Sequence, residues 1–448
     1  MHPPTKSELL TLSQAEREER INFARRLGNH RAHAGFLKRA LRRTHRAKVL
    51  GKGAPDPEAS RSTDIPPPAW RGMPTTGVRK TFALLIEFQD HRHRNSAGAI
   101  NQTLYGRHQS GAPYDSVAAY YDRASYHQLD LYGGTTLGWY LTRYPRTLIE
   151  QSDAGRDRLI KEALEHFHSQ GHDFSQYDTD GDGFVDFFQV LWAGRDTGWG
   201  TFWWPYQASF GDQSFSLDNV KFGTYAWMWD SRRGAPFDAE TAIHETGHAL
   251  GLPDYYDYDK SKGPAGGLGG LDMMDSAKYD HNCFSKWVLD WVKPRMVTKG
   301  SQVITLGPSG SLGDCVFIWP RVSRPAWFGE YFMAQNRERV DNDLALPGEG
   351  LVIWHVDARL KKMWDYACDN SFTEHKLLRL MEADGAEQIE AGKPADSGDY
   401  YRVGTSFGPA TVPSSATYGR RRSGVEVTDI SAQGSGLCAT FSVARRDP

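Results

Sequence analysis

Apolar residues along this chain fall into two patterns, short uninterrupted runs typical of buried strands and stretches with the spacing of amphipathic helices. KTFALLIEF (Lys80–Phe88) is bounded by turn-forming residues and predicts a buried strand. YDSVAAYYDRASYHQLDLYG (Tyr114–Gly133) begins as a helix and then becomes a strand, and DRLIKEALEHFH (Asp157–His168) is a second predicted helix. In YDTDGDGFVDFFQVLWAG (Tyr177–Gly194) a polar loop leads into an apolar strand. Residues 79–298 are therefore expected to form one domain of mixed helices and strands.

The pattern changes near Lys299, where short apolar runs separated by Gly and Pro turns take over. The predicted strands there are SQVITLG, DCVFIWP, EYFMAQN, GLVIWHVD, KLLRLMEADG, VEVTDIS and LCATFSV. No repeat period is evident, which sets solenoids and propellers aside. The expected fold class is α+β, with residues 299–448 forming a β-rich, sandwich-like portion packed on the preceding domain.

The beginning of the chain differs in composition, because it is rich in basic residues. Residues 1–53 carry thirteen Lys and Arg against four Glu, and Ala34, Leu37 and Leu41 could share one helix face. Two interpretations of this basic N-terminal extension stay open, a solvated and partly helical segment or a pro-segment that covers an acidic cleft. Residues 54–78 are rich in Pro and Gly and are expected to be a linker.

Composition and charge exclude several classes of protein. The 448 residues are 39% hydrophobic, enough for a substantial core and two or three structural units. The net charge of -2 does not suggest a nucleic-acid partner. No run of 18 apolar residues occurs, so no transmembrane segment is predicted, and the polar first thirty residues show no signal peptide. The oligomeric state is not predicted by these features.

The four cysteines form no CxxC pair or zinc-finger spacing. They are Cys283, Cys315, Cys368 and Cys438. Two disulfides with three possible pairings, or four isolated buried thiols, are equally compatible with this spacing.

The stretch AIHETGHALGLPDYYD (Ala242–Asp257) holds two histidines four residues apart. A helix is expected here, with Asp238 as its N-cap and Gly251 as its stop. Because residues four apart share one helix face, His244 and His248 can present imidazole nitrogens to one ion, and neutral imidazoles suit zinc. The spacing therefore predicts a zinc site, with two incidental surface histidines as the alternative.

Glu245 is the candidate catalytic base of this motif. It stands beside His244 and can take a proton from a zinc-activated water without being a ligand itself. Zinc lowers the pKa of a bound water toward about 7, which makes hydroxide available at neutral pH. A purely structural metal site has no need of such a base.

A catalytic zinc needs a third protein ligand and one open position. Gly251 lets the chain turn out of the helix, and Asp254 is the next polar residue with reach, which gives the pattern H-E-x-x-H-x-x-G-x-x-D. Asp257 and Asp259 are less well placed, and they remain alternative candidates for the third ligand. No Glu occurs between Glu245 and Glu330, so a glutamate on a following helix is not available. Asp254 is therefore the favoured third ligand.

Residues further along the chain are candidates for two supporting roles. The Gly-rich segment GGLGGLDMMDSAKYD (Gly266–Asp280) contains Met273 and Met274, either of which could lie in a turn that packs beneath the ligand histidines. Tyr279 is a candidate donor to the oxyanion of the reaction, although a packing role is the favoured interpretation for this tyrosine.

The segment DTDGDGFVD has the alternating carboxylates of a calcium-binding loop. Gly183 stands at the sixth position, where such a loop turns sharply, and the twelfth position is Gln189 in place of the bidentate glutamate of an EF-hand. The sequence predicts a structural calcium site outside an EF-hand fold, with a solvated acidic turn as the alternative. The candidate ligands are Asp178, Asp180, Asp182 and Asp186.

Taken in this order, these segments resemble the immune inhibitor A-type family of secreted, metzincin-like zinc metallopeptidases. The likeness extends over roughly residues 79–443 and is specific in its motifs. The segments that carry it are FALLIEFQD, SVAAYYDRASYHQLDLYGGTTLGWY, YDTDGDGFVDFFQVLWAG, the zinc motif, LDMMDS, EYFMAQNRE, GEGLVIWHVD and EADG.

The resemblance implies a metzincin-like peptidase domain that holds zinc through His244, His248 and Asp254, with Glu245 as general base. It also implies Met274 as the methionine of the supporting turn, cleavage of proteins or peptides outside the cell, and calcium for stability. This sequence departs from the family pattern in two places, the absence of a visible signal peptide and Gln335, where a glutamate is usual. No cysteine precedes Cys283, so inhibition by a pro-segment thiolate is excluded.

The sequence is also compatible with two other functional classes. Aromatic segments at GWGTFWWPY (Gly198–Tyr206) and YAWMWD (Tyr225–Asp230) motivate a non-catalytic, metal-stabilised binding module, although core packing is the favoured role for most of these side chains. The same zinc chemistry also serves amidases and other hydrolases that act on non-protein substrates.

Overall fold

The computed structural model describes residues 4, 6–32, 37, 72–107, 113–231, 235–261, 264–322, 328–361, 365–371, 374–432 and 436–444. The chain divides into two compact units, unit 1 with Met1–Asn29 and Pro67–Pro253 and unit 2 with His30–Pro66 and Asp254–Pro448. The division at Pro253 differs from the predicted boundary near residue 298. Most of the predicted linker, and the second half of the basic extension with Ala34 and Leu41, lie outside the described residues.

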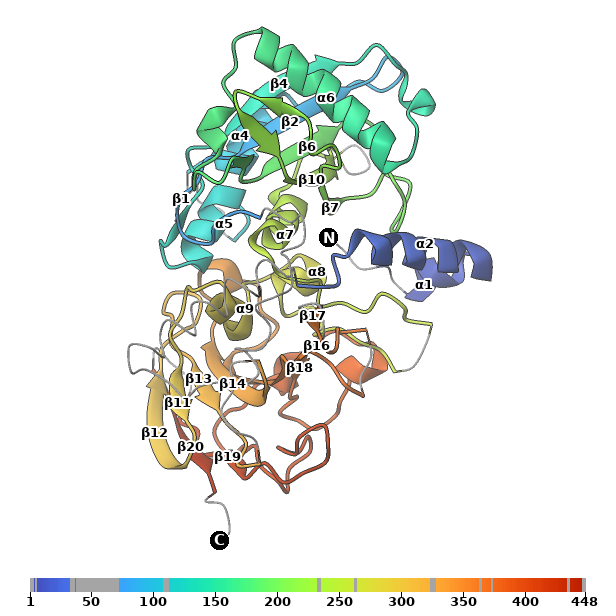
Figure 1. Cartoon of the computed structure of the whole chain (residues 1–448). Coiled ribbons are helices and arrows are strands. Elements are labelled where there is room, and N and C mark those ends of the chain that lie inside the picture. Colours follow the sequence, from blue (N-terminus) through green and yellow to red (C-terminus); the bar gives the residue numbers. More distant parts are fainter. Residues whose placement is uncertain are drawn as a thin grey trace. The chain divides into compact units, whose positions relative to one another are not determined.

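Unit 1 contains a central sheet with helices packed on it (Figure 1). Its helices are α1 (Lys6–Leu10), α2 (Gln14–Leu27), α4 (Ala97–Tyr105), α5 (Val117–Ala124), α6 (Asp153–Ser169) and α7 (Ala239–Leu250). Its strands are β1 (Gly77–Val78), β2 (Phe82–Glu87), β3 (Leu129–Asp130), β4 (Thr135–Leu141), β5 (Phe184–Val185), β6 (Phe188–Trp192), β7 (Tyr206–Ser209), β8 (Ser216–Leu217), β9 (Val220–Phe222) and β10 (Thr224–Trp229).

The central sheet has the strand order β4-β2-β6-β10-β7. The first four strands are parallel to their neighbours, and β7 pairs antiparallel with β10 at one edge. One face of the sheet is aromatic, because Phe82, Phe188 and Tyr225 stack on neighbouring strands with ring centroids about 5 Å apart. Such offset aromatic contacts add to the free energy of burial. The aromatic segment YAWMWD is therefore mostly core, as the sequence favoured.

Helix α6 covers this aromatic face. Arg156 of α6 donates to the phenol of Tyr206 (2.8 Å) and to that of Tyr225. Helix α7 contacts β10 and β7, and α5 packs against α7, where the phenol of Tyr121 donates to the Ile243 carbonyl (2.7 Å). The rigid sheet and α5 together fix α7, the helix of the zinc motif.

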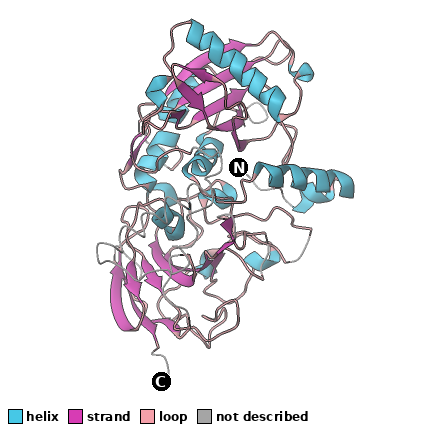
Figure 2. Cartoon of the chain, in the orientation of Figure 1, coloured by secondary structure: helices cyan, strands magenta, loops and turns pink. Residues whose placement is uncertain are grey.

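Unit 2 contains two larger sheets and the two-stranded sheet β16-β17, joined by long irregular segments (Figure 2). Its helices are α8 (Met273–Ser276) and α9 (Cys283–Val288). Its strands are β11 (Arg295–Val297), β12 (Gly300–Leu306), β13 (Val316–Ile318), β14 (Glu330–Arg337), β15 (Gly350–Asp357), β16 (Leu360–Lys361), β17 (Asp365–Tyr366), β18 (Leu378–Leu380), β19 (Val425–Thr428) and β20 (Leu437–Val443).

The core of unit 2 is built from both of its larger sheets. Their strand orders are β11-β13-β14-β15-β18 and β12-β20-β19. One continuous apolar cluster draws residues from each, including Phe332 and Ile353 from the first and Val427 and Phe441 from the second. Alternate residues of β19 and β20 point into this cluster, as expected for strands with one buried face.

Gln335, where the resembled family usually has glutamate, is buried in β14 as a neutral amide with three partners. Its Oε1 accepts from the Cys283 N–H (2.7 Å) and the Trp354 indole (3.0 Å), while its Nε2 donates to Ser309 Oγ (2.9 Å). An amide can donate and accept at once, which an ionised glutamate cannot. The substitution is therefore accommodated by local hydrogen bonding.

The predicted elements agree well with those observed. A mixed α and β architecture is confirmed, and a strand or helix lies in each segment predicted to contain one within the described part of the chain. Helices α4, α8 and α9 were not predicted. Among the described residues, no helix is both long enough and apolar enough to span a membrane. The four cysteines are free thiols.

Candidate metal centre

The two ends of α7 lie where the sequence predicts them. The helix follows Asp238, whose side chain makes no capping hydrogen bond. At the other end Gly251 has a left-handed backbone (φ 108°), which glycine adopts without strain. The Leu252 N–H donates to the Gly247 carbonyl (3.0 Å) and closes the helix in a Schellman turn. The chain thereby turns sharply where the predicted third ligand follows.

Three candidate ligands converge at this end of α7. One ligand atom from each of His244, His248 and Asp254 lies within 4.8 Å of the others, and all three residues are buried. The two imidazole centroids are 4.9 Å apart, with the rings at 82°. Two nitrogens and one carboxylate oxygen form a donor set that suits a catalytic zinc, which keeps a fourth position for water or substrate. The residues present therefore fit this ion.

The turn after α7 orients one of the ligands. Nδ1 of His248 lies 2.8 Å from the Leu252 carbonyl oxygen. Since a carbonyl can only accept, Nδ1 carries the proton and donates. Nε2 is therefore the nitrogen of His248 that would bind a metal, an arrangement typical of metal-binding histidines. Gly251, by allowing the turn, also helps to set the tautomer of a ligand.

Asp254 has a hydrogen-bond partner that sequence reasoning missed. The phenol of Tyr258 donates to Asp254 Oδ2, and both residues are buried. Burial, followed by the Asp254 carboxylate, raises the pKa of Tyr258 well above its usual range, so the phenol keeps its proton. Such a partner fixes the orientation of a ligating carboxylate. The sequence feature that could have predicted this partner is a tyrosine four residues after the candidate ligand.

The two other carboxylates considered as third ligands are engaged locally. Asp257 accepts from the backbone N–H of Asp259 (2.8 Å) and of Gly266 (3.2 Å), and burial raises the pKa of Asp257 to about 6. Asp259 accepts from the hydroxyl of Ser261 (2.5 Å). Among the described residues neither carboxylate belongs to the group formed with the two histidines. The geometry therefore favours Asp254.

Glu245 is fully buried on α7. The edge strand β7 brings Tyr206 into its neighbourhood. Burial raises the pKa of Tyr206 to about 12, the Arg156 guanidinium opposes this rise, and the Glu245 carboxylate adds to it. Tyr206 also donates to the Phe202 carbonyl (3.1 Å). The sequence had assigned Tyr206 only to a general aromatic segment, whereas in the structure its phenol lies within the electrostatic range of the candidate base.

The supporting candidates lie in the segment after the zinc motif. Met274 is buried in α8, and its carbonyl accepts from the Tyr255 N–H (2.9 Å), which ties α8 to the residue after Asp254. Tyr279 is half-buried, and burial raises its pKa while the Arg337 guanidinium opposes that rise. The roles predicted for Met274 and Tyr279 stay predictions.

Helix α2 lies against the strand that carries Tyr206. The Phe23 ring meets the Tyr206 ring edge-on, with centroids 5.8 Å apart. In the amide orientation that satisfies both partners, with its oxygen and nitrogen exchanged, Asn29 donates to the carbonyl of Gln207 and accepts from its N–H, at 3.0 Å each. Because β7 is an edge strand, Asn29 occupies backbone groups to which an extended peptide could bind.

The acidic loop of unit 1 brings together part of its predicted ligand set. One carboxylate oxygen from each of Asp178, Asp180 and Asp186 lies within 4.8 Å of the others. Asp182 is outside this group, and its carboxylate accepts from the Phe184 N–H (3.0 Å). Oxygen ligands of this kind suit calcium.

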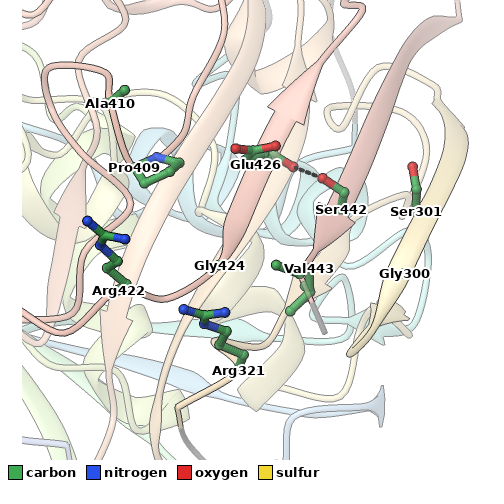
Figure 3. Close-up of a pocket in the computed structure, with 11 residues that line it drawn as sticks. Gly300, Ser301, Arg321, Pro409, Ala410, Arg422, Gly424, Glu426, Ser442 and Val443 are labelled. Carbon is green, nitrogen blue, oxygen red and sulfur yellow. Dashed lines mark hydrogen bonds between the residues drawn. The ribbon is translucent and has the colours of Figure 1, made fainter. Parts of the chain in front are cut away.

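A separate hollow of about 650 Å³ lies in unit 2 beside β12, β19 and β20 (Figure 3). It is lined by Arg321, Arg422 and Glu426, among other residues, and the Ser442 hydroxyl donates to the Glu426 carbonyl across two strands (3.4 Å). None of the candidate metal ligands lines it. The hollow therefore belongs to a different part of the surface.

Comparison with known proteins gives one informative match. "Immune inhibitor A" of Bacillus thuringiensis subsp. alesti is 27% identical to this chain over a 236-residue match, and the match covers 40% of this chain and 34% of that protein. The chain thus matches about a third of that protein's length. No protein-family model matches the chain. The match supports a distant relation between part of this chain and immune inhibitor A.

Proposed function

We propose that this chain is a zinc-dependent endopeptidase that hydrolyses peptide bonds in proteins. The observation that carries the proposal is the convergence of His244, His248 and Asp254 in a buried group, with Glu245 on the same helix. The relation to immune inhibitor A supports a metallopeptidase. A zinc ion held by this group supplies a Lewis acid for the scissile carbonyl and activates water at neutral pH.

Glu245 moves the proton in this proposal. Its carboxylate accepts the proton of the attacking water and later delivers it to the leaving amine, the two tasks of a general base and acid in peptide hydrolysis. Burial of Glu245 excludes bulk water from the proton path. Tyr279 remains the candidate for stabilising the oxyanion.

Three further features belong to the same proposal. Calcium held by the loop of Asp178, Asp180 and Asp186 stabilises the peptidase domain, whose metzincin-like fold is also part of the proposal. The protein acts outside the cell on protein or peptide substrates. The N-terminal segment restrains activity, because Phe23 covers Tyr206 and Asn29 occupies the edge of β7.

The test compares the wild-type chain with Glu245→Ala in a casein digestion assay, with bound zinc measured in both. Loss of a general base lowers the rate by about a hundredfold to ten-thousandfold, while the zinc ligands remain. We expect Glu245→Ala to bind zinc normally and to cleave casein at a rate reduced to that extent, and a chelator to inactivate the wild type. His127→Ala, an exposed histidine in unit 1, is the matched control and keeps full activity.

The outcomes separate the rival functions. A Glu245→Ala chain that binds zinc and cleaves casein at the wild-type rate contradicts the proposal. A wild-type chain that binds zinc and leaves casein and a peptide library intact is a binding module. Hydrolysis confined to small non-peptide amides identifies an amidase.

A further inference from the structure

Three carboxylates of unit 2 form an acidic group that neither the zinc motif nor the calcium-like loop includes. Glu382 and Asp384 follow strand β18, and Asp399 ends the short helix η6 (Ser397–Asp399). One oxygen from each carboxylate lies within 4.8 Å of the others. Glu382 and Asp399 are each only 2% exposed, whereas Asp384 is exposed. The group is therefore buried on one side and accessible from solvent through Asp384.

The charge of this group is not balanced by a basic side chain. Arg379 and Lys376, which lie on or beside β18, both pair with Glu390 (3.0 and 2.9 Å). Within the described part of the chain, no Lys or Arg forms an ion pair with any of the three carboxylates. Buried carboxylates normally pair with a cation, bind a metal or hold a proton.

Backbone donors satisfy only part of this acidic group. Glu382 Oε2 accepts from the Gln388 N–H (2.6 Å), and Asp399 Oδ2 accepts from the Asp396 N–H (2.7 Å). The second oxygen of Asp399, Oδ1, is buried and has no hydrogen-bond partner. A buried carboxylate oxygen without a donor, in a group of other acids, indicates either a bound cation or a proton shared with a neighbouring acid.

The local backbone makes room for the third carboxylate. A Cβ atom at Gly398 would lie 2.6 Å from Asp384 Oδ2, so a side chain there would displace this oxygen. Glycine at 398 therefore leaves room for the Asp384 carboxylate within this group.

We propose that Glu382, Asp384 and Asp399 bind a divalent cation, calcium, in unit 2. All three ligands are carboxylate oxygens, the hard donors that calcium prefers, and no nitrogen or sulfur ligand that would favour zinc belongs to the group. The ion joins the turn after β18 to η6 and offsets the repulsion between the acids. Without it, burial raises the pKa of Glu382 to about 7 and that of Asp399 to about 6.

The test measures calcium bound to the full-length chain by equilibrium dialysis and elemental analysis, which needs no peptidase activity. The variants are Asp384→Asn, which alters an exposed residue, and Gly398→Ala, which keeps the charge of the group. Asp429→Asn is the matched control, because it removes an exposed acid outside the group. Asp180→Asn removes a candidate ligand of the calcium-like loop of unit 1, so that calcium bound there can be counted separately.

We expect Asp384→Asn and Gly398→Ala each to lose about one calcium ion per chain at a calcium concentration that saturates the wild type. Combining Asp384→Asn with Asp180→Asn should remove a second ion, and Asp429→Asn should remove none. The calcium-dependent rise in Tm should shrink in parallel.

Unchanged calcium binding by Asp384→Asn and by Asp399→Asn overturns the proposal. The competing explanation, a proton shared between Glu382 and Asp399, makes a distinct prediction. In that case Asp399→Asn changes Tm by the same amount with calcium and with a chelator, and bound calcium stays at the wild-type level.

Discussion

The metal group at the end of α7 and the acidic loop of unit 1 differ in what holds their ligands. His244, His248 and Asp254 are all buried, and Leu252 and Tyr258 orient two of them through hydrogen bonds. In the loop only one of the three convergent carboxylates is buried, and all stand on irregular backbone. The ligands of the first group are therefore preorganised by buried contacts, whereas those of the loop are held mainly by hydrogen bonds within the loop itself. Preorganisation of this kind is what catalysis requires and structural calcium binding does not.

The largest effect expected from this comparison follows loss of one ligand of the preorganised group. Asp254→Ala removes the carboxylate, so zinc is lost with the several kcal/mol of catalysis that it provides, about a thousandfold in casein hydrolysis. Asp259→Asn is the control and should keep both zinc and activity. Retention of zinc by Asp254→Ala and its loss in Asp259→Asn would reverse the ligand assignment.

A buried acid outside both groups sharpens the comparison by showing what burial does without a cation. Asp275 accepts from the N–H groups of Leu268 (3.1 Å) and Gly270 (2.5 Å), yet burial raises its pKa to about 6. In the unfolded chain the pKa is about 3.9. The folded state therefore binds the proton more tightly, and this contribution to stability is present below about pH 4 and lost as the pH rises through about 6.

Asp275→Asn removes this dependence. The wild type should lose on the order of 3 kcal/mol of unfolding free energy, relative to the variant, between about pH 4 and pH 7. Urea unfolding across this range measures the difference. Parallel profiles for the two chains would show that Asp275 titrates normally in the folded state.

The loop should respond to calcium, while the α7 group should not. At a calcium concentration one hundred times the Kd, binding to the folded state alone stabilises it by about 2.7 kcal/mol. Asp180→Asn should lose most of the corresponding rise in Tm and keep its zinc. A Tm shift equal to that of the wild type would remove this loop from the list of calcium sites.

Tyr258→Phe tests whether orientation of Asp254 matters. Loss of the phenol should weaken zinc binding about tenfold to a hundredfold, the usual effect of removing a hydrogen bond to a metal ligand. Competition with a zinc-binding dye measures this affinity. Tyr144→Phe, at a tyrosine 45% exposed, serves as the control. Equal affinities of Tyr258→Phe and the wild type would show that the helix and turn alone preorganise the site.

The smallest expected effect comes from the N-terminal segment. Phe23→Ala removes the edge-on contact with Tyr206, which is worth about 0.5–1.5 kcal/mol, so kcat/KM for a peptide substrate should rise roughly twofold to tenfold. Glu18→Ala, at an exposed position of the same helix, should leave it unchanged. A fall in kcat/KM for Phe23→Ala would mean that α2 supports the site instead of restraining it.

The parts of the site that sequence predicts best are those fixed by local geometry. Helical spacing alone brings His244 beside His248, and Gly251 marks the turn that leads to Asp254. The strands of unit 2 were equally predictable, because short apolar runs between Gly and Pro turns describe them directly.

What the sequence could not predict depends on contacts between distant segments. Tyr206 comes within the electrostatic range of Glu245 through the order of strands in a sheet, and Asp399 approaches Glu382 across sixteen intervening residues. Asp182 fits the loop pattern by spacing, yet it lies outside the convergent group, and its carboxylate accepts from the Phe184 N–H. Neither the periodicity of apolar residues nor the spacing within a motif indicates which distant residues come close together in the fold.

Anomalous diffraction at the zinc edge, from crystals of the full-length chain, tests the central claim most directly. The account predicts one strong peak about 2.0–2.2 Å from a ring nitrogen of His244, from Nε2 of His248 and from a carboxylate oxygen of Asp254. A peak held by other residues, or zinc-soaked crystals with no peak at the end of α7, would contradict it.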